Sequence, residues 1–304
     1  MILYKNLIPV FLVFAVGSEF AAGSATAQDN HLADSLAPIA ATTDGHLGVA
    51  ITYAGTGETT LLHGHDHYPM MSVFKFPLAL YILDQADKQK LSLDEPVVIH
   101  KKRWSRIFSP MLNSYPGKTV HLTIRDLTAD IILLSDNVAC DVLLGRIGGP
   151  GVLNSYIHAL GIEEINIANT ERQMAADPKK VYENWCSPAA MNILLQQFYE
   201  HRVLSDSATG ELLQWMIQSK PRPNRLKGLL DSKILVAHKP GTSDTDSAGL
   251  TAATNDVGIL TLPGGSHLYV TVFLTDSHAD EATRERAIAL VGRLAADIYA
   301  SQSR

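Results

Sequence analysis

Apolar residues follow a strand-like pattern at both ends of the chain. Near the N-terminus, β-branched and apolar residues fill 46–55 and 59–64 on either side of Thr56-Gly57-Glu58, which predicts a strand, a turn and a second strand. Further strands are predicted over 233–241, 249–262 and 267–276. A short helix is expected around 31–41, and the amphipathic stretch 281–300 predicts a closing helix.

The middle of the chain has a different period. From Ser72 to about Met216, apolar residues recur at three- and four-residue spacing, which is typical of helices. Helices are predicted over 76–90, 123–134, 137–149 and 188–202. The sequence therefore predicts an α/β domain built from both chain ends, residues 28–67 and 220–304, around an inserted all-α domain of residues 68–219.

The N-terminus has the features of an export signal. Lys5 precedes an apolar run at 7–16, and small residues follow up to Ala25-Thr26-Ala27, which predicts a signal peptide over 1–27 with cleavage after Ala27. The apolar run is about half the length of a bilayer span, which argues against a retained anchor. We therefore expect a periplasmic protein with no membrane attachment after cleavage.

Composition excludes some partners and leaves others open. The 304 residues, of which 46% are hydrophobic, suffice for a large core, and the net charge of -6 provides no broad basic field for nucleic acid or anionic membranes. Cys140 and Cys186 allow only one intramolecular pairing. Because Cys140 falls in an apolar helical pattern, two free thiols are the favoured interpretation.

A histidine-rich segment raises the question of zinc. Residues 63–67, HGHDH, resemble the H-x-H-x-D-H pattern of zinc hydrolases but lack the spacer before Asp66. The histidines further along the chain are scattered singly: His100, His121, His158, His201, His238, His267 and His278. An exposed hairpin end is the simpler interpretation, and we expect no metal.

A serine and a lysine begin the first helical pattern. Ser72 and Lys75 are three residues apart, so a helix would place an amine beside a hydroxyl on one face. Serine is a weak nucleophile without a neighbouring base, and a lysine supplies one when burial or another cation lowers its pKa. The backbone N–H of Ser72 would lie near the positive end of the helix, where it could stabilise an oxyanion.

Two further motifs make this pair specific. Ser135-Asp136-Asn137 and Lys239-Pro240-Gly241-Thr242 complete the S-x-x-K, S-D-N and K-T-G set of serine β-lactamases and penicillin-binding proteins. With SVFKF, SDNVACD, RLKGLL, AHKPGTS and TAATND, the chain resembles class A serine β-lactamases over its mature length, most of all the PER-type extended-spectrum branch. The resemblance implies an antiparallel sheet flanked by helices, an inserted helical domain, a site between the two, and no metal or organic cofactor.

The resemblance also implies roles for individual residues. Ser72 would be the nucleophile, Lys75 and Glu171 would compete or cooperate as the base for acylation, and Ser135 would relay a proton to the departing lactam nitrogen. Glu171 would also drive water onto the acyl ester. The backbone N–H groups of Ser72 and Thr242 would form the oxyanion hole. Substrate would be bound by Asn137, Lys239, Gly241, Thr242, Phe108 and Arg225.

Three of these assignments compete with ordinary alternatives. Phe108 falls where the family has an aromatic gate, but a core phenylalanine is the other interpretation. Arg225 falls where some members keep an extra carboxylate-binding arginine, and the alternative is a solvated surface arginine. Glu171 lies in a segment that resembles the lactamase loop, against a merely solvated glutamate.

Two positions depart from the family pattern. Ala175 stands where an asparagine usually helps to hold the deacylating water, and Gln173 is one candidate to replace it. Pro240 removes a hydroxyl that usually meets the substrate carboxylate, and it requires an edge strand; Arg225 or Thr242 could partly compensate. These departures keep open a sensor or a penicillin-binding protein that is acylated without turnover. The main expectation is a monomeric β-lactamase that acts on penicillins and cephalosporins, including oxyimino-cephalosporins.

Overall fold

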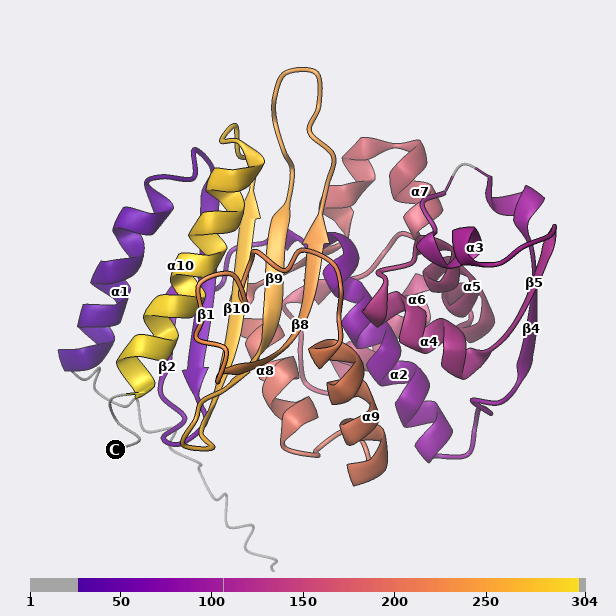
Figure 1. Ribbon diagram of the computed structural model, residues 1–304, viewed down its shortest axis with the longest axis horizontal. Coiled ribbons are helices and arrows are strands. Elements are labelled where there is room, and N and C mark those ends of the chain that lie inside the picture. Colours follow the sequence, from indigo (N-terminus) through magenta and orange to yellow (C-terminus); the bar gives the residue numbers. More distant parts are fainter. Residues whose placement is uncertain (1–26, 106, 301–304) are drawn as a thin grey trace, which may run out of the picture.

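The computed structural model describes residues 27–105 and 107–300, so the expected signal peptide lies almost entirely outside the described residues. One five-stranded sheet carries the architecture, in the order β2-β1-β10-β9-β8, with every neighbouring pair antiparallel (Figure 1). The strands are β1 (His46–Tyr53), β2 (Thr59–Leu62), β8 (Leu235–Thr242), β9 (Thr254–Thr261) and β10 (His267–Thr275). The predicted sheet built from both chain ends is therefore confirmed.

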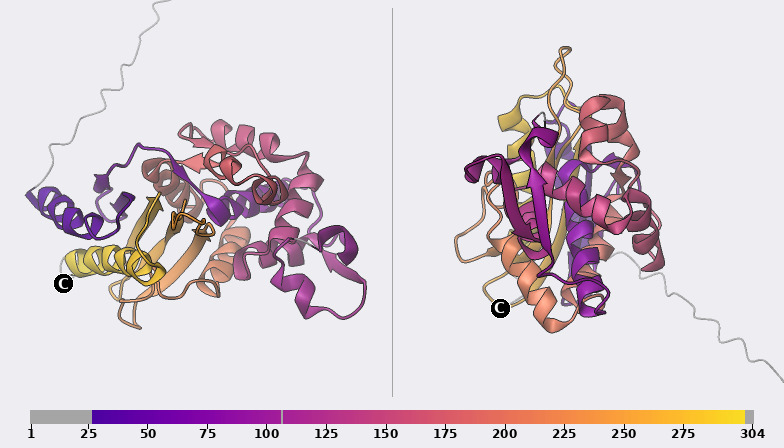
Figure 2. Two further views of the ribbon diagram at one scale, coloured as in Figure 1. Left: turned by 90° about the horizontal axis from the view of Figure 1, so that it is seen from above. Right: turned by 90° about the vertical axis from the view of Figure 1, so that its right-hand side faces the viewer.

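Helices cover both faces of this sheet. The helices α1 (Ala27–Ala40) and α10 (Glu281–Ala300) pack together on one face, and the remaining helices lie on the other side (Figure 2). Side chains alternate accordingly along β10, where Val270 and Val272 join the core under α1 and α10. Tyr269 and Phe273 join the larger core on the opposite face. Because both faces are covered, the central strands are buried almost throughout.

The middle of the chain contains the predicted helices and several more. The prediction is confirmed for α2 (Lys75–Asp87), α4 (Ile124–Leu133), α5 (Asn137–Ile147) and α8 (Pro188–Tyr199). The sequence prediction missed shorter or less periodic helices: α3 (Pro110–Ser114), α6 (Pro150–Ala159), α7 (Glu171–Ala176), α9 (Asp206–Ile217), and the 3₁₀ turns η1 (Met71–Phe74), η2 (Lys101–Trp104) and η3 (Pro178–Glu183). The helix α2 is buried on nearly every side, so it carries Lys75 into the interior.

The middle segment is not purely helical, which the sequence did not predict. The strands β4 (Pro96–His100) and β5 (Thr119–Thr123) pair with each other, and β3 (Tyr68–Pro69), β7 (Trp185–Cys186) and β6 (Ile165–Asn166) form a small sheet. Strands of two residues are too short to show a period. The division into domains at residues 67 and 220 stays a prediction.

Two further features are the state of the cysteines and the question of a membrane-spanning helix. Both cysteines, Cys140 and Cys186, are buried free thiols, as favoured from the sequence, and burial raises the pKa of each. Within 27–105 and 107–300, no helix combines the length and the apolar character needed to cross a membrane.

Candidate active site

Lys75 is the centre of the candidate site. Ser72 lies in the 3₁₀ turn η1, directly before α2, and Lys75 is the first residue of that helix. The Lys75 Nζ atom donates to Ser72 Oγ at 2.9 Å, to the Ser135 carbonyl at 2.8 Å and to Asn137 Oδ1 at 2.6 Å. It also lies 2.8 Å from Glu171 Oε1, and the Lys75 side chain is fully buried. Four oxygens therefore surround an ammonium with only three protons, which suits exchange of partners during a proton transfer.

A second lysine, Lys239, contacts Ser135, which follows α4 in the chain. Lys239, on β8, donates from Nζ to Ser135 Oγ at 2.9 Å and to the Pro240 carbonyl at 2.9 Å. Burial lowers the Lys239 pKa well below its ordinary value, and the nearby Lys75 lowers it further. Ser135 thus bridges the two lysines, because its carbonyl accepts from Lys75 and its hydroxyl accepts from Lys239.

The turn that presents Ser135 is held by a buried carboxylate. Ser135 has a φ of 57°, in the left-handed region that non-glycine residues seldom adopt. Asp136 is fully buried and accepts from Ser109 Oγ at 2.7 Å, Met111 N at 2.9 Å and Ala139 N at 2.9 Å. These bonds cap α5 and fix both sides of the turn, so the middle residue of the S-D-N motif is a structural anchor.

Glu171 begins a short helix whose start is doubly capped. In α7, Thr170 and Gln173 form a capping box, and the buried Asp141 of α5 accepts from Glu171 N at 2.7 Å and from Arg172 N at 3.0 Å. Burial raises the Asp141 pKa to about 6, although these two N–H groups oppose the shift. Glu171 is 5% exposed, so the alternative of a solvated loop glutamate is wrong.

Two residues bear on the asparagine that the family usually has near Glu171, and both face solvent: Ala175, which stands in its place, and Gln173, the candidate to replace it. Ala175 is exposed, and its side chain has no donor or acceptor. Gln173 is exposed as well, and its Oε1 accepts from Thr170 N at 2.9 Å. Gln173, the candidate to replace the asparagine, therefore already uses its side-chain oxygen in the cap of α7.

The strand β8 runs directly beside Ser72. It is the edge strand of the sheet, which fits the proline at position 240. A Cβ at Gly241 would lie 2.5 Å from the Met70 carbonyl oxygen and 3.2 Å from Ser72 N, so only glycine permits this approach. From β9, Asn255 donates to the Pro69 and Met70 carbonyls, which holds the segment before Ser72 against the sheet.

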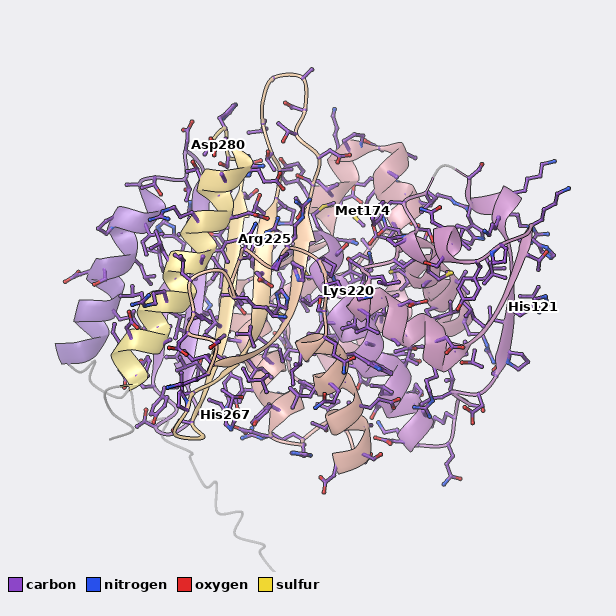
Figure 3. The ribbon with its side chains drawn as sticks, viewed as in Figure 1. His121, Met174, Lys220, Arg225, His267 and Asp280 are labelled. Carbon is purple, nitrogen blue, oxygen red and sulfur yellow. The ribbon has the colours of Figure 1, made fainter. Side chains whose placement is uncertain are left out.

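Arg225, labelled in Figure 3, is fully buried and contacts both β8 and β9. Its guanidinium donates to the carbonyls of Gly241 and Asn255, to Thr242 Oγ1 at 2.7 Å, and to Glu285 Oε1 at 3.2 Å. Burial lowers its pKa, and the charges of Asp256 and Glu285 oppose that shift. The alternative of a solvated surface arginine is wrong, because Arg225 is fully buried and acts on the strand and on Thr242.

Phe108 lies beside the S-D-N turn. Its side chain is 66% exposed, so the alternative of a core phenylalanine is wrong. Its carbonyl accepts from Asn137 N at 3.3 Å, which ties its backbone to the S-D-N turn. Together with Trp104 and Leu112, it lines a hollow of about 580 Å³. On the far side of Thr242 a groove of about 380 Å³ reaches to His278 and Arg284.

The structure reveals several supporting residues that the sequence analysis missed. Asp141 holds α7, Asn255 holds the segment before Ser72, and the buried Asp256 accepts from His238 Nδ1 at 2.9 Å and from Leu226 N at 3.1 Å. The last contacts join β8 and β9 to the segment that carries Arg225. For Asp141 a signal was present, because a charged residue interrupts the apolar pattern of 137–149.

Comparisons with known proteins agree with this architecture. The chain matches the β-lactamase enzyme family over residues 31–302. It is 39% identical over 250 residues to the extended-spectrum β-lactamase PER-1 of Pseudomonas aeruginosa, covering 82% of this chain and 81% of the relative. It is 33% identical to the β-lactamase VEB-1 of the same organism, covering 90% and 92%. Among solved structures, a β-lactamase from Chitinophaga pinensis is 42% identical, with a TM-score of 0.85 and coverage of 90% and 100%.

Fold, motifs and relatives together define a hydrolase of the serine β-lactamase class. The chain belongs to the β-lactamase enzyme family, within class A, and is similar to its extended-spectrum members. The structure of the TLA-3 extended-spectrum β-lactamase, 34% identical, gives a TM-score of 0.87 over 90% of this chain and 99% of that chain.

Proposed function

We propose that the protein hydrolyses penicillins and cephalosporins through an acyl-enzyme on Ser72. The observation that carries this proposal is the buried Lys75 amine, which lies 2.9 Å from Ser72 Oγ and 2.8 Å from Glu171 Oε1. In the first step Ser72 Oγ attacks the lactam carbonyl, and its proton passes to the Lys75–Glu171 pair. The backbone N–H groups of Ser72 and Thr242 receive the developing oxyanion.

Ser135 and Lys239 act on the leaving group. When the lactam C–N bond breaks, the nitrogen needs a proton, and Ser135 Oγ supplies it. Lys239, 2.9 Å from that oxygen, carries a lowered pKa and restores the proton to the serine. The proton taken from Ser72 leaves the Lys75–Glu171 pair for solvent, from which Lys239 is protonated again, so Glu171 is a carboxylate once more. Asn137 Oδ1 accepts a hydrogen bond from Lys75 Nζ. The asparagine would also bind the substrate's side-chain amide.

Glu171 completes the cycle in this proposal. Its carboxylate takes a proton from a water, which attacks the ester carbon. When the bond from that carbon to Ser72 Oγ breaks, the proton passes from Glu171 through Lys75 to the serine oxygen. Asp141 supports this step by fixing the Glu171 backbone. Because Ala175 has no polar side chain, the water must be held by Glu171 and by groups other than residue 175.

The carboxylate of the substrate would lie at the groove beside Thr242. Pro240 has no hydroxyl, so Thr242 carries the side-chain hydroxyl that this strand offers. Arg225 donates to Thr242 Oγ1 at 2.7 Å, which leaves the threonine proton free to point toward substrate. Arg225 therefore acts through Thr242 rather than by touching the substrate.

Substrate range and location are also part of the proposal. Likeness to relatives named as extended-spectrum β-lactamases supports oxyimino-cephalosporins as substrates. The exposed Phe108, whose backbone is tied to the S-D-N turn, offers a surface against which a bulky substituent can pack. With the signal peptide predicted from the sequence, the enzyme would act in the periplasm as a monomer.

One observation favours a second candidate, a β-lactam sensor that stays acylated. Ala175 is exposed and apolar, and the Gln173 oxygen is occupied in the cap of α7. Against it, Glu171 is buried beside Lys75, where a base for deacylation is needed.

The proposal is tested by steady-state hydrolysis of a chromogenic cephalosporin and an oxyimino-cephalosporin, with a chelator in every sample. We expect many turnovers by the wild type and none by Ser72→Ala, and mass spectrometry should find the transient adduct on Ser72. Hydrolysis that survives Ser72→Ala would overturn the serine mechanism. One equivalent of product followed by a stable adduct would support the sensor.

A further inference from the structure

Three potential metal ligands, none of them among the groups that surround Lys75, gather at one end of the β1–β2 hairpin. His46 is the first residue of β1, and His63 and Asp66 lie between β2 and β3. One ligand atom from each of the three lies within 4.8 Å of the others, and all three residues are exposed. His46 Nε2 is 2.8 Å from Asp66 Oδ2. HGHDH alone contains only two of these ligands, and the fold adds the third from β1.

Ring stacking and one backbone contact define how the two imidazoles lie in the metal-free chain. The His46 ring stacks on His63, with centroids 4.5 Å apart and an interplanar angle of 14°, and on the buried Tyr68 at 5.4 Å and 6°. The Leu47 carbonyl lies 3.2 Å from His63 Nδ1. A proton on Nδ1 would donate to this carbonyl and leave the lone pair of Nε2 facing outward, as metal-binding histidines usually require.

The turn that carries His63 is strained. His63 has a φ of 46°, in the left-handed region, and the Asp66 N–H closes the turn on the His63 carbonyl at 3.3 Å. A histidine seldom adopts this conformation, and such outliers cluster at functional positions. The strained backbone places His63 and Asp66 on the same side as His46.

We propose that His46, His63 and Asp66 bind one zinc ion. Two imidazoles and a carboxylate are ligands that zinc accepts at about 2.0–2.2 Å, which places donor atoms about 3–3.5 Å apart. His46 Nε2 and Asp66 Oδ2, 2.8 Å apart, are close to this spacing. A metal lies in the plane of each imidazole that binds it, so the stacked His46 and His63 rings must turn out of their parallel arrangement to share one ion, a change of side-chain torsion that their exposure permits. Water completes the coordination. The ion would join β1 to the turn before β3 and so stabilise the folded chain, with no part in the lactam chemistry.

Neighbouring histidines provide a matched control. His65 belongs to the same HGHDH segment and is exposed, but its Nδ1 pairs with Glu164 at 3.0 Å. His67 stacks on Trp185, with centroids 3.4 Å apart. Neither belongs to the three-residue cluster. If zinc bound to exposed histidines without a specific site, loss of His65 would weaken binding as much as loss of His46.

The test is isothermal titration of zinc chloride into tag-free protein, for the wild type and for His46→Gln, His63→Gln, Asp66→Asn and His65→Gln. We expect one zinc per wild-type chain, at least tenfold weaker binding in each of the first three variants, and unchanged binding in His65→Gln. Zinc should raise the melting temperature of the wild type and of His65→Gln only. Metal-free melting and cephalosporin turnover confirm that each variant is folded.

Three results would overturn the site. They are no stoichiometric binding by the wild type, full affinity in His46→Gln, and loss of binding in His65→Gln. Cobalt substitution adds a readout independent of affinity, because the visible absorption of Co²⁺ reports its ligands. The cobalt spectrum of the wild type should differ from that of free cobalt and return to it in His63→Gln; an unchanged spectrum in that variant would exclude His63 as a ligand.

Discussion

The Asp141→Asn substitution tests how a buried carboxylate supports Glu171. Asp141 accepts from the backbone N–H groups of Glu171 and Arg172, while its burial raises the pKa from 3.8 to about 6. The folded state therefore holds the Asp141 proton more tightly than the unfolded chain does. This group favours folding below about pH 4, and its contribution is lost as the pH rises through 6. A shift of about two units corresponds to about 3 kcal/mol.

An asparagine stays neutral and has almost the same shape, so it avoids this loss. We expect similar free energies of unfolding for wild type and Asp141→Asn at pH 4, and the variant to gain about 3 kcal/mol on the wild type by pH 7.5. The amide offers one acceptor oxygen instead of two, so one N–H of α7 loses its partner. Deacylation should therefore slow by about tenfold, a cost of about 1.4 kcal/mol.

Urea unfolding at a series of pH values, with single-turnover deacylation on the same samples, measures both effects. A stability difference independent of pH would refute the assignment of the raised pKa to Asp141. A wild type that gains on the variant as the pH rises would show that its two hydrogen bonds outweigh the cost of burying the charge. Unchanged deacylation would show that Asp141 does not position Glu171.

Three further substitutions test the strand β8 and its support. Gly241→Ala should slow acylation by about 100-fold, measured as the burst rate, because its Cβ would lie 2.5 Å from the Met70 carbonyl and push the strand off Ser72. Arg225→Met should cost about 3–5 kcal/mol in urea unfolding, since Glu285 and two carbonyls lose a buried partner. Pro240→Thr should lower KM about two- to tenfold by restoring one hydrogen bond, and an unchanged KM would contradict that account.

Much of the fold was predictable because its long elements carry a clear period. The sheet strands and α2, α4, α5 and α8 each extend over enough residues for a two- or three-to-four-residue pattern to stand out. The three motifs likewise indicated which side chains meet, and Lys75 does contact Ser72 and Asn137.

The rest depends on contacts between distant parts of the chain. Two-residue strands such as β6 exist only through their partners, and nothing local marks them. The burial of Arg225 follows from the carbonyls of β8 and β9 packed around it, which no pattern near residue 225 reveals. His46 lies near His63 and Asp66 because the hairpin folds back, a proximity that the spacing within HGHDH does not reveal.

The central claim is that one enzyme acylates Ser72 and then releases it through Glu171. Stopped-flow hydrolysis of a chromogenic cephalosporin by wild type and Glu171→Gln, with mass spectrometry of the same mixtures, tests it most directly. We predict sustained turnover by the wild type, and a single stoichiometric burst by the variant with the acyl group retained on Ser72. Sustained turnover by Glu171→Gln at the wild-type rate, or a wild type that stops after one equivalent, would contradict the account.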